Sequence, residues 1–174
     1  MSYIKTKLSI QDKDILNIIY QELEKITLPT TFQQTGGQGH QIRTGTVNQK
    51  FARQTCFGKV HFQGQIKDSV YTKKYPYMMS LFKLFIKNHY PSFKFKSVYV
   101  NKNTICKEHV DSKNIGESLL VGFGNYTGGQ TILFINNKPV KIHIKTYSLI
   151  FNGTQIIHKS EEFKGTRYSL VFFN

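Results

Sequence analysis

The N-terminal part of the chain has apolar residues at the spacing of an amphipathic helix. Ser9 and Asp12 resemble a capping box with Asp in place of Glu, a signal for the start of a helix. The apolar positions behind it are Ile15, Ile18, Ile19, Leu23 and Ile26. This pattern predicts a helix over about residues 10–26, which Pro29 closes.

A second apolar stripe follows Pro76, a residue suited to the first turn of a helix. The stripe consists of Met78, Leu81, Phe82 and Phe85. It predicts a helix that buries one face and ends at Tyr90-Pro91. Between the two helices, the stretch Thr30–Thr72 is rich in Gly and Gln, which favours short strands joined by mobile loops.

From Phe93 to the C-terminus the apolar period becomes two, the period of β-strands. Strands are expected at about 95–101, 104–111, 117–123, 129–135, 139–144, 147–151, 155–158 and 166–173. Turns rich in Gly and Asn separate them. Eight short strands after two helices predict a mainly β fold, a double-sheet jelly roll with flanking helices that brace one face.

The last predicted strand has apolar residues on both of its faces, so both faces must be covered. One face carries Tyr168, Leu170 and Phe172, and the other carries Arg167, Ser169, Val171 and Phe173. Only Arg167 and Ser169 break the apolar pattern. Because a buried guanidinium without a partner is costly, an anionic ligand inside the barrel explains Arg167 better than a satisfied core arginine does.

Composition limits the chain to a single domain, residues 1–174, and gives it a strong positive charge. At 174 residues and 39% apolar, it can bury one sizeable core and is too short for two ordinary domains. Its 24 Lys and Arg against 10 Asp and Glu give a net charge of +14, spread along the chain. Such a field favours polyanions such as nucleic acid. The alternative is that the lysines merely keep the protein soluble.

The sequence shows no targeting or membrane signal. Residues 1–7 lack the apolar region of a signal peptide, and no run approaches the roughly 20 apolar residues of a membrane helix. Cys56 and Cys106 form no C-x-x-C pair and fit a reducing compartment. We therefore expect a soluble intracellular protein, nuclear or cytoplasmic, that is neither secreted nor bound to a membrane.

His109-Val110-Asp111 places an imidazole and a carboxylate at i and i+2, which point to the same side of a strand. With His158 as a third ligand, they form the facial triad of non-haem iron(II) oxygenases, which leaves positions open for a co-substrate and oxygen. H-x-D alone is frequent by chance, but its order with His158, Arg167 and Ser169 is more specific. A structural His158, bonded to the backbone, is the alternative.

At these residues the chain resembles the 2-oxoglutarate- and iron(II)-dependent dioxygenases, over about residues 93–174. The resemblance implies that this range is a double-stranded β-helix, or jelly-roll, catalytic core, and that residues 1–92 are a helical and loop support region. It implies an enzyme that uses Fe(II), O2 and 2-oxoglutarate as co-substrate. His109, Asp111 and His158 are then its catalytic metal ligands.

The same resemblance points to residues for the co-substrate. Arg167-Tyr168-Ser169 matches an R-x-S pair that grips the distal carboxylate of 2-oxoglutarate through a guanidinium fork and a hydroxyl. Asn101, with Asn103 expected on the same strand face, matches an asparagine just upstream of H-x-D that supplies amide donors to 2-oxoglutarate in AlkB-like members.

The segment from His109 to Ser118 is similar to the TET/JBP branch, which hydroxylates 5-methylcytosine or thymine. In that branch an Asn three residues after the metal-binding Asp faces the target base, and Asn114 occupies this place. An amide offers both donor and acceptor to a flipped base, although a turn residue is the alternative for Asn114. Arg43 and Arg53 are either surface charge or line the mouth of the site and contact phosphates.

These residues and the charge together favour hydroxylation of a methyl-bearing base in nucleic acid, with DNA preferred over RNA as the partner. A protein or peptide hydroxylase of the prolyl type suits the short spacing from His158 to Arg167 equally well. A non-catalytic, basic nucleic-acid-binding module is an alternative of a different class. The target base, the strandedness, the extent of oxidation and the oligomeric state do not follow from the sequence.

Overall fold

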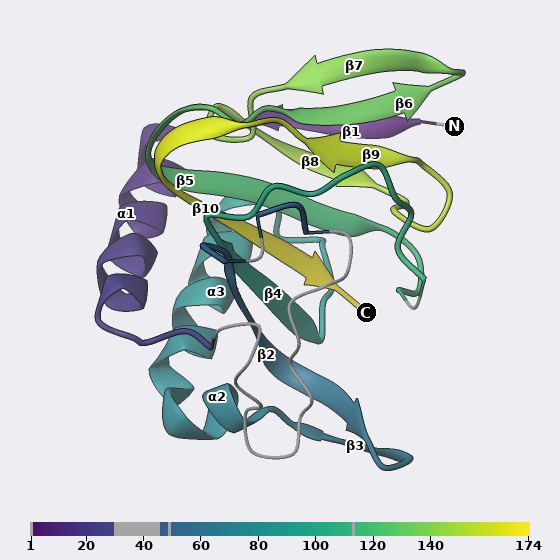
Figure 1. Cartoon of the computed structure of the whole chain (residues 1–174). Coiled ribbons are helices and arrows are strands. Elements are labelled where there is room, and N and C mark those ends of the chain that lie inside the picture. The colour runs from purple at the N-terminus through teal and green to yellow at the C-terminus, as the bar shows by residue number, and fades with distance from the viewer. Residues whose placement is uncertain (1, 30–45, 49, 113) are drawn as a thin grey trace.

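The protein consists of two antiparallel sheets that face each other, with helices covering the outer face of the larger sheet (Figure 1). The computed structural model describes residues 2–29, 46–48, 50–112 and 114–174. The elements in these ranges are β1 (Tyr3–Lys7), α1 (Ile10–Glu24), β2 (Arg53–Phe62), β3 (Gln65–Asp68), α2 (Val70–Lys74), α3 (Pro76–His89), β4 (Ser97–Lys102), β5 (Ser118–Gly128), β6 (Thr131–Ile135), β7 (Lys138–Ile142), β8 (Tyr147–Phe151), β9 (His158–Ser160) and β10 (Phe163–Phe173).

The larger sheet has the strand order β1-β8-β5-β10-β4-β2-β3, and the smaller sheet has the order β7-β6-β9. Every pair of neighbouring strands is antiparallel. The long strands β5 and β10 lie side by side near the middle of the larger sheet. Two facing antiparallel sheets with helices on one side confirm the predicted jelly-roll class.

Strands on both sides of residue 93 build the larger sheet. β2 pairs with β4, and β1 pairs with β8 at the edge, so residues 1–92 contribute strands as well as helices and loops. The sequence pattern does not predict β1, because Tyr3–Lys7 carries two lysines and shows little apolar alternation. An edge strand needs only one paired side, and its backbone bonds to β8 decide its conformation.

Both predicted helices are present, and their starts are those that the sequence indicates. The Ser9 hydroxyl accepts a hydrogen bond from Asp12 N (3.0 Å), and Asp12 Oδ2 accepts one from Ser9 N (2.8 Å), which completes the capping box. α1 ends at Glu24, two residues earlier than predicted, and α3 begins at Pro76. None of the helices in the described ranges is long and apolar enough to cross a membrane.

The two faces of β10 contribute to two separate apolar clusters, as its sequence predicts. Tyr168, Leu170 and Phe172 are fully buried against the helices. Val171 contacts the cluster between the two sheets. Full burial of one large apolar side chain contributes about 1.5–3 kcal/mol. The side chains of β10 therefore stabilise the packing of the helices on one face of the larger sheet and of the smaller sheet on the other.

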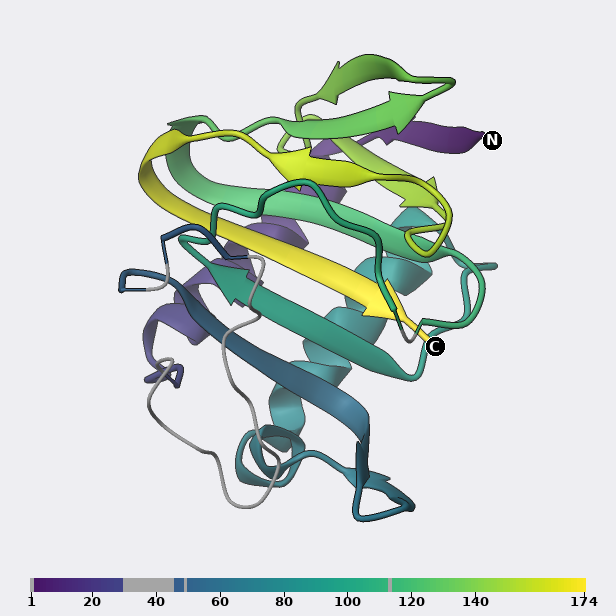
Figure 2. The ribbon, with the colours of Figure 1, turned by 45° about the vertical axis from the view of Figure 1, so that its right-hand side comes forward.

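The predicted strand over 104–111 is wrong, although the segment is extended and lies beside β9 (Figure 2). It forms only isolated bridges, Thr46 with Cys106 and His109 with His158. The reason lies at Asn103, whose φ of 54° turns the chain out of β4. Hydrogen bonds between the backbones of His109 and His158, 3.0 and 3.1 Å long, then hold the segment against the smaller sheet.

Candidate active site

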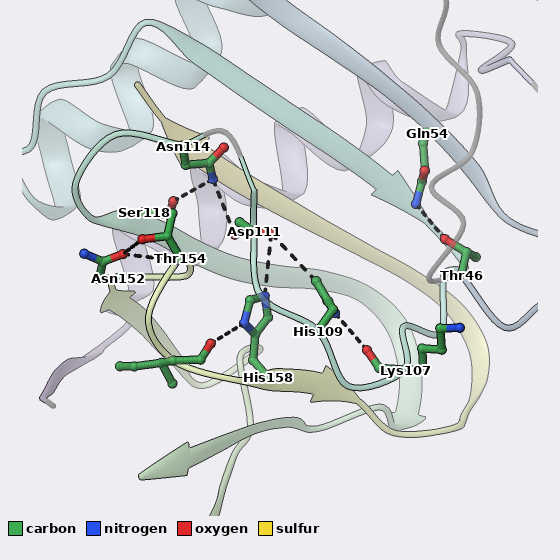
Figure 3. Close-up of polar contacts among 11 residues, drawn as sticks. Thr46, Gln54, Lys107, His109, Asp111, Asn114, Ser118, Asn152, Thr154 and His158 are labelled. Atoms are coloured by element: carbon green, nitrogen blue, oxygen red, sulfur yellow. Dashed lines mark hydrogen bonds and ion pairs between the residues drawn. The ribbon is translucent and has the colours of Figure 1, made fainter. Parts of the chain in front are cut away.

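His109, Asp111 and His158 converge between the two sheets, as the sequence predicts (Figure 3). One ligand atom from each side chain lies within 4.8 Å of the other two. Asp111 Oδ1 is 3.7 Å from His109 Nε2 and 3.8 Å from His158 Nε2. Metal bonds to such atoms are about 2.0–2.2 Å long, so a single ion fits between the three atoms. It is the one group of this kind in the described part of the chain.

The backbone sets the orientation of both imidazoles. His109 Nδ1 is 2.8 Å from the carbonyl of Lys107, and His158 Nδ1 is 2.8 Å from the carbonyl of Ile156. A carbonyl oxygen can only accept, so each Nδ1 donates its proton there, and Nε2 is the ring nitrogen on the side of Asp111. Two imidazole nitrogens and one carboxylate oxygen are a donor set that suits iron(II).

Asn114 contacts the triad itself. Its Nδ2 donates to Asp111 Oδ2 (3.4 Å) and to Ser118 Oγ (3.3 Å), while the amide oxygen points away from both (Figure 3). The sequence predicts that Asn114 offers a donor and an acceptor to a base. Because an amide has two N–H hydrogens and both point into the protein, only its oxygen is available to a substrate.

Arg167 lies in the same pocket and is buried, as its place on β10 predicts. Its Nε donates to the Gly129 carbonyl (3.1 Å), and no carboxylate of the described residues pairs with its guanidinium. Burial lowers the pKa of Arg167, against the opposing influence of Tyr126 and Cys106. A buried cation that pairs with no carboxylate of the described residues attracts an anionic ligand strongly.

The Tyr126 ring faces the Arg167 guanidinium, 5.6 Å from ring centre to Cζ. Burial raises the pKa of Tyr126, and the charge of Arg167 opposes this shift. The hydroxyl is buried beside the same guanidinium. The sequence does not predict the place of Tyr126 beside Arg167, because no motif or spacing links the two residues.

A row of polar side chains crosses three strands on the pocket side of the larger sheet. The register places Gln54 of β2 opposite Asn101 of β4, and Asn101 opposite Ser169 of β10. Asn101 Nδ2 donates to Ser169 Oγ (3.3 Å), and Gln54 donates to Thr46 Oγ1 (3.3 Å; Figure 3). Asn101 and Ser169 thus lie where the sequence predicts, whereas Gln54 is a polar pocket residue that strand pairing alone reveals.

One pocket connects the metal-ligand group with Arg167. Its apolar wall comes from Leu120, Phe151 and Val171, and its polar wall includes Thr131. Cys106 also lines it and forms no disulfide. A small anion that reaches Arg167 therefore lies in the same enclosed space as the group of His109, Asp111 and His158.

Asn103 does not share a strand face with Asn101, and that prediction is wrong. β4 ends at Lys102, and the Asn103 side chain accepts a hydrogen bond from Arg167 N (2.8 Å) instead of facing the pocket. Asn103 N–H in turn donates to the Arg167 carbonyl (2.7 Å). Asn103 therefore holds the backbone that carries Arg167.

Arg53 does not line the mouth of the pocket, and that prediction is also wrong. Arg53 pairs with Lys102, which pairs with Tyr168, and residues paired across neighbouring strands point to the same face of the sheet. Because Tyr168 is buried against the helices, Arg53 lies on the helix side of the larger sheet. Its guanidinium donates to the carbonyls of Lys50 (3.2 Å) and Ala52 (2.8 Å). Arg43 lies outside the described residues.

No family model and no curated protein sequence matches this chain. Solved structures do match. A Pseudomonas putida prolyl-4-hydroxylase is 10% identical over 99% of this chain and 91% of its own, with a TM-score of 0.57. NgTET1 in complex with 5mC DNA is 16% identical over 98% and 71%, with a TM-score of 0.63. The Neurospora crassa protein NcT7H, truncated at its C-terminus and in apo form, is 14% identical over 98% and 81%, with a TM-score of 0.58.

These likenesses show that the chain shares its fold with the prolyl-4-hydroxylase, with NgTET1 and with NcT7H. A structure of the full-length NcT7H, 11% identical with a TM-score of 0.58, contains α-ketoglutarate, which is 2-oxoglutarate. The expectation of a mainly β jelly-roll fold is thus confirmed.

Proposed function

We propose that the protein is a dioxygenase that depends on iron(II) and 2-oxoglutarate. The observation that carries this proposal is the combination of two features in one pocket. One is the group of His109, Asp111 and His158; the other is the buried Arg167, which pairs with no described carboxylate. Either feature alone is common, but together they provide a metal with open positions and a cation for a dicarboxylate.

In this proposal the chain mainly positions the reactants. When bound, iron(II) supplies the oxygen chemistry: one atom of O2 enters a substrate C–H bond and the other enters succinate, as 2-oxoglutarate loses CO2. Nε2 of both histidines and Asp111 Oδ1 would hold the ion. Arg167 binds the distal carboxylate of 2-oxoglutarate through two N–H groups, and Ser169 adds a hydroxyl donor. Asn101 supports Ser169 through its hydrogen bond.

Tyr126 supports Arg167 in the proposed carboxylate site. Its ring centre lies 5.6 Å from the guanidinium carbon. Burial lowers the pKa of Arg167, and the neighbouring Tyr126 opposes this shift, so Tyr126 helps to keep the guanidinium charged. Gly129 leaves the space that Arg167 occupies, since a Cβ there would lie 2.8 Å from Arg167 Nε.

We infer that the substrate is a methyl-bearing nucleobase of the 5-methylcytosine or thymine type, in DNA. Two fold neighbours support this choice: NgTET1 was solved with 5mC DNA, and NcT7H with α-ketoglutarate and 5-formyluracil. The net charge of +14 adds a field that attracts a polyanion.

The second candidate is a peptide hydroxylase of the prolyl type. The prolyl-4-hydroxylase neighbour matches nearly the whole of both chains. Beside the pocket runs an open groove whose lining includes the apolar side chains of Phe134 and Pro139. Its rim carries both charges, with ion pairs Lys141–Glu161 (2.6 Å) and Lys159–Glu108 (3.6 Å), and such a rim suits a peptide better than a polyanion.

The decisive experiment compares substrates on one preparation of iron-loaded protein. Methylated and unmethylated DNA, the matching RNA and a proline-containing peptide are incubated with 2-oxoglutarate, and succinate and oxygenated product are measured by mass spectrometry. We expect stoichiometric succinate and one added oxygen atom on the methylated DNA, and neither product from Asp111→Ala.

Turnover of the peptide alone would select the prolyl-type enzyme. If the wild-type protein bound DNA in a salt-dependent way, but neither bound iron nor formed succinate, it would be the non-catalytic binding module.

A further inference from the structure

The two oxygens of the Asp111 carboxylate have different surroundings. Oδ1 faces Nε2 of both His109 and His158, at 3.7 and 3.8 Å. Oδ2 faces the other way, towards Asn114 and Gly153. The orientation of the carboxylate therefore does not require a bound ion. It is set by Asn114 and Gly153, neither of which is one of the three proposed metal ligands.

Asn114 holds Oδ2 from one side and is itself anchored. Its Nδ2 donates to Asp111 Oδ2 (3.4 Å) and to the hydroxyl of Ser118 (3.3 Å). Ser118 is the first residue of β5, is 1% exposed and pairs with Phe151 of β8. The amide thus connects the loop that carries Asp111 to the rigid larger sheet.

Gly153 confines Oδ2 from the other side. Its carbonyl accepts a hydrogen bond from Asp111 N (2.8 Å), so the two backbones lie in contact. A Cβ at position 153 would lie 2.3 Å from Asp111 Oδ2 and 3.5 Å from His158 Cε1. Gly153 does not have a positive φ, so the position requires glycine for its space and not for its backbone conformation.

We propose that Asn114 is a positioning residue that, together with Gly153, restricts Asp111 to one-oxygen coordination of the metal. A carboxylate can bind an ion through one oxygen or through both. If the Asp111 carboxylate turned, Oδ2 would take a second position on the ion, and a position needed by the co-substrate or O2 would be lost. The hydrogen bond from Asn114 opposes this rotation. The proposal rests on the proposed function, because it assumes a metal at the triad.

A positioning role for Asn114 differs from a role in which Asn114 contacts a substrate base. The two roles predict different results for metal binding. A base-reading Asn114 affects only reactions with substrate. A positioning Asn114 affects metal binding in the absence of substrate and co-substrate. Outer-shell partners of metal ligands typically contribute about 10–100-fold to metal affinity or activity.

The experiment measures metal binding of the whole chain without substrate. Co(II) serves as the probe, because its visible absorption reports the number and arrangement of ligands, and Fe(II) is titrated in parallel without oxygen. The variants are Asn114→Ala and Asn114→Leu; leucine keeps the volume but donates no hydrogen bond. Asn125→Ala, at an exposed position on β5, is the matched control. Thermal unfolding of each apo-protein shows that it is folded.

We expect both Asn114 variants to bind metal about 10–100-fold more weakly and to change the Co(II) spectrum, while Asn125→Ala behaves as the wild type. Gly153→Ala, if it folds, should change the spectrum in the same way. Wild-type affinity and spectrum in Asn114→Ala, or their recovery in Asn114→Leu, would overturn the positioning role. If the wild-type protein bound no metal, or Asp111→Ala bound it equally well, the proposed function itself would fail.

Discussion

At the scale of single residues, two glycines decide where the functional side chains lie. Gly129, with φ of 65°, leaves room for Arg167, and its carbonyl accepts the Nε hydrogen bond. Gly153 does the same for Asp111, which donates its backbone N–H to the Gly153 carbonyl. In both cases the absence of a glycine side chain lets a charged residue pack against the glycine backbone. A hydrogen bond to the glycine carbonyl then fixes the residue, and its remaining polar atoms face the pocket.

Replacing Asp111 by Ala should remove the single carboxylate of the metal-ligand group. We expect metal affinity to fall by more than the roughly 10–100-fold that is typical for outer-shell partners, and succinate formation to stop. Titration with Fe(II) in the absence of oxygen measures the first effect. Glu108→Ala is the control, since Glu108 is close in sequence but mostly exposed and paired with Lys159. Full affinity in Asp111→Ala would show that the triad is not the metal site.

Replacing Arg167 by Lys keeps the charge but removes the planar fork. We expect the affinity for 2-oxoglutarate to fall by about tenfold to a hundredfold, because hydrogen bonds to charged groups are each worth about 1.5–3 kcal/mol. Iron binding should be unchanged. Arg53→Lys is the matched control, because Arg53 lies on the opposite face of the sheet. Equal 2-oxoglutarate affinity in Arg167→Lys, Ser169→Ala and wild type would remove the co-substrate site from β10.

At the scale of elements, a buried polar chain fastens both long helices to the sheet. Asp12 Oδ2 at the start of α1 lies 2.7 Å from His89 Nδ1 at the end of α3, and His89 Nε2 lies 2.6 Å from Ser148 Oγ on β8. Asn88 also donates to Asp12 (2.8 Å). Carboxylate, imidazole and hydroxyl follow the order of a hydrolase triad. All three are buried, however, so no substrate reaches them and their role is structural.

The Asp12 carboxylate should make stability depend on pH. Burial raises its pKa, but hydrogen bonds from Ser9, His89 and Asn88 lower it more, so the pKa of Asp12 in the folded protein is lower than its usual value. A depressed carboxylate pKa stabilises the fold above the unfolded value, and this contribution disappears as the pH falls through the folded value. We expect Asp12→Asn to lower the free energy of unfolding by about 1–3 kcal/mol at neutral pH, and by less at about pH 3.

Urea unfolding at several pH values measures this difference. Asp14→Asn is the control, because Asp14 is exposed on the same helix. A gap between wild type and Asp12→Asn that stayed constant down to about pH 3 would contradict the assignment of the pKa shift to this network.

At the scale of the whole molecule, the charge of +14 should govern binding to polynucleotides. Binding that releases counterions weakens with salt, with a slope in log–log form of about −0.9 for each phosphate neutralised on duplex DNA. We expect more than a tenfold loss of affinity between about 50 and 200 mM salt, measured by fluorescence anisotropy on an unmethylated duplex. Affinity that did not change with salt would count against nucleic acid as the partner.

Arg53 provides a finer measurement of the same property. The sheet register places it away from the pocket, so any phosphate that it contacts lies on the helix side of the larger sheet. If it contributes to binding on its own face, Arg53→Ala should reduce the salt slope by about one and weaken all DNA sequences equally.

Local patterns in the sequence determined the parts of the structure that depend on neighbouring residues. The capping box at Ser9 and the proline at position 76 mark helix starts, because helix ends are decided within one turn. The alternation along β10 separated its two faces, including the burial of Arg167, because side chains alternate on any strand. The order of His109, Asp111, His158 and Arg167 likewise indicated the composition of the pocket.

Only the tertiary structure decided which strands pair and in what register. Pairing with β8 makes Tyr3–Lys7 a strand, and the register of β2 turns Gln54 towards the pocket and Arg53 away from it. The two donors of Asn114 are likewise directed by Asp111 and by Ser118 on β5, and not by its place after H-x-D. The physical reason is the same in each case. A shift of one residue in register reverses every face, and register depends on hydrogen bonds to strands far away in the sequence.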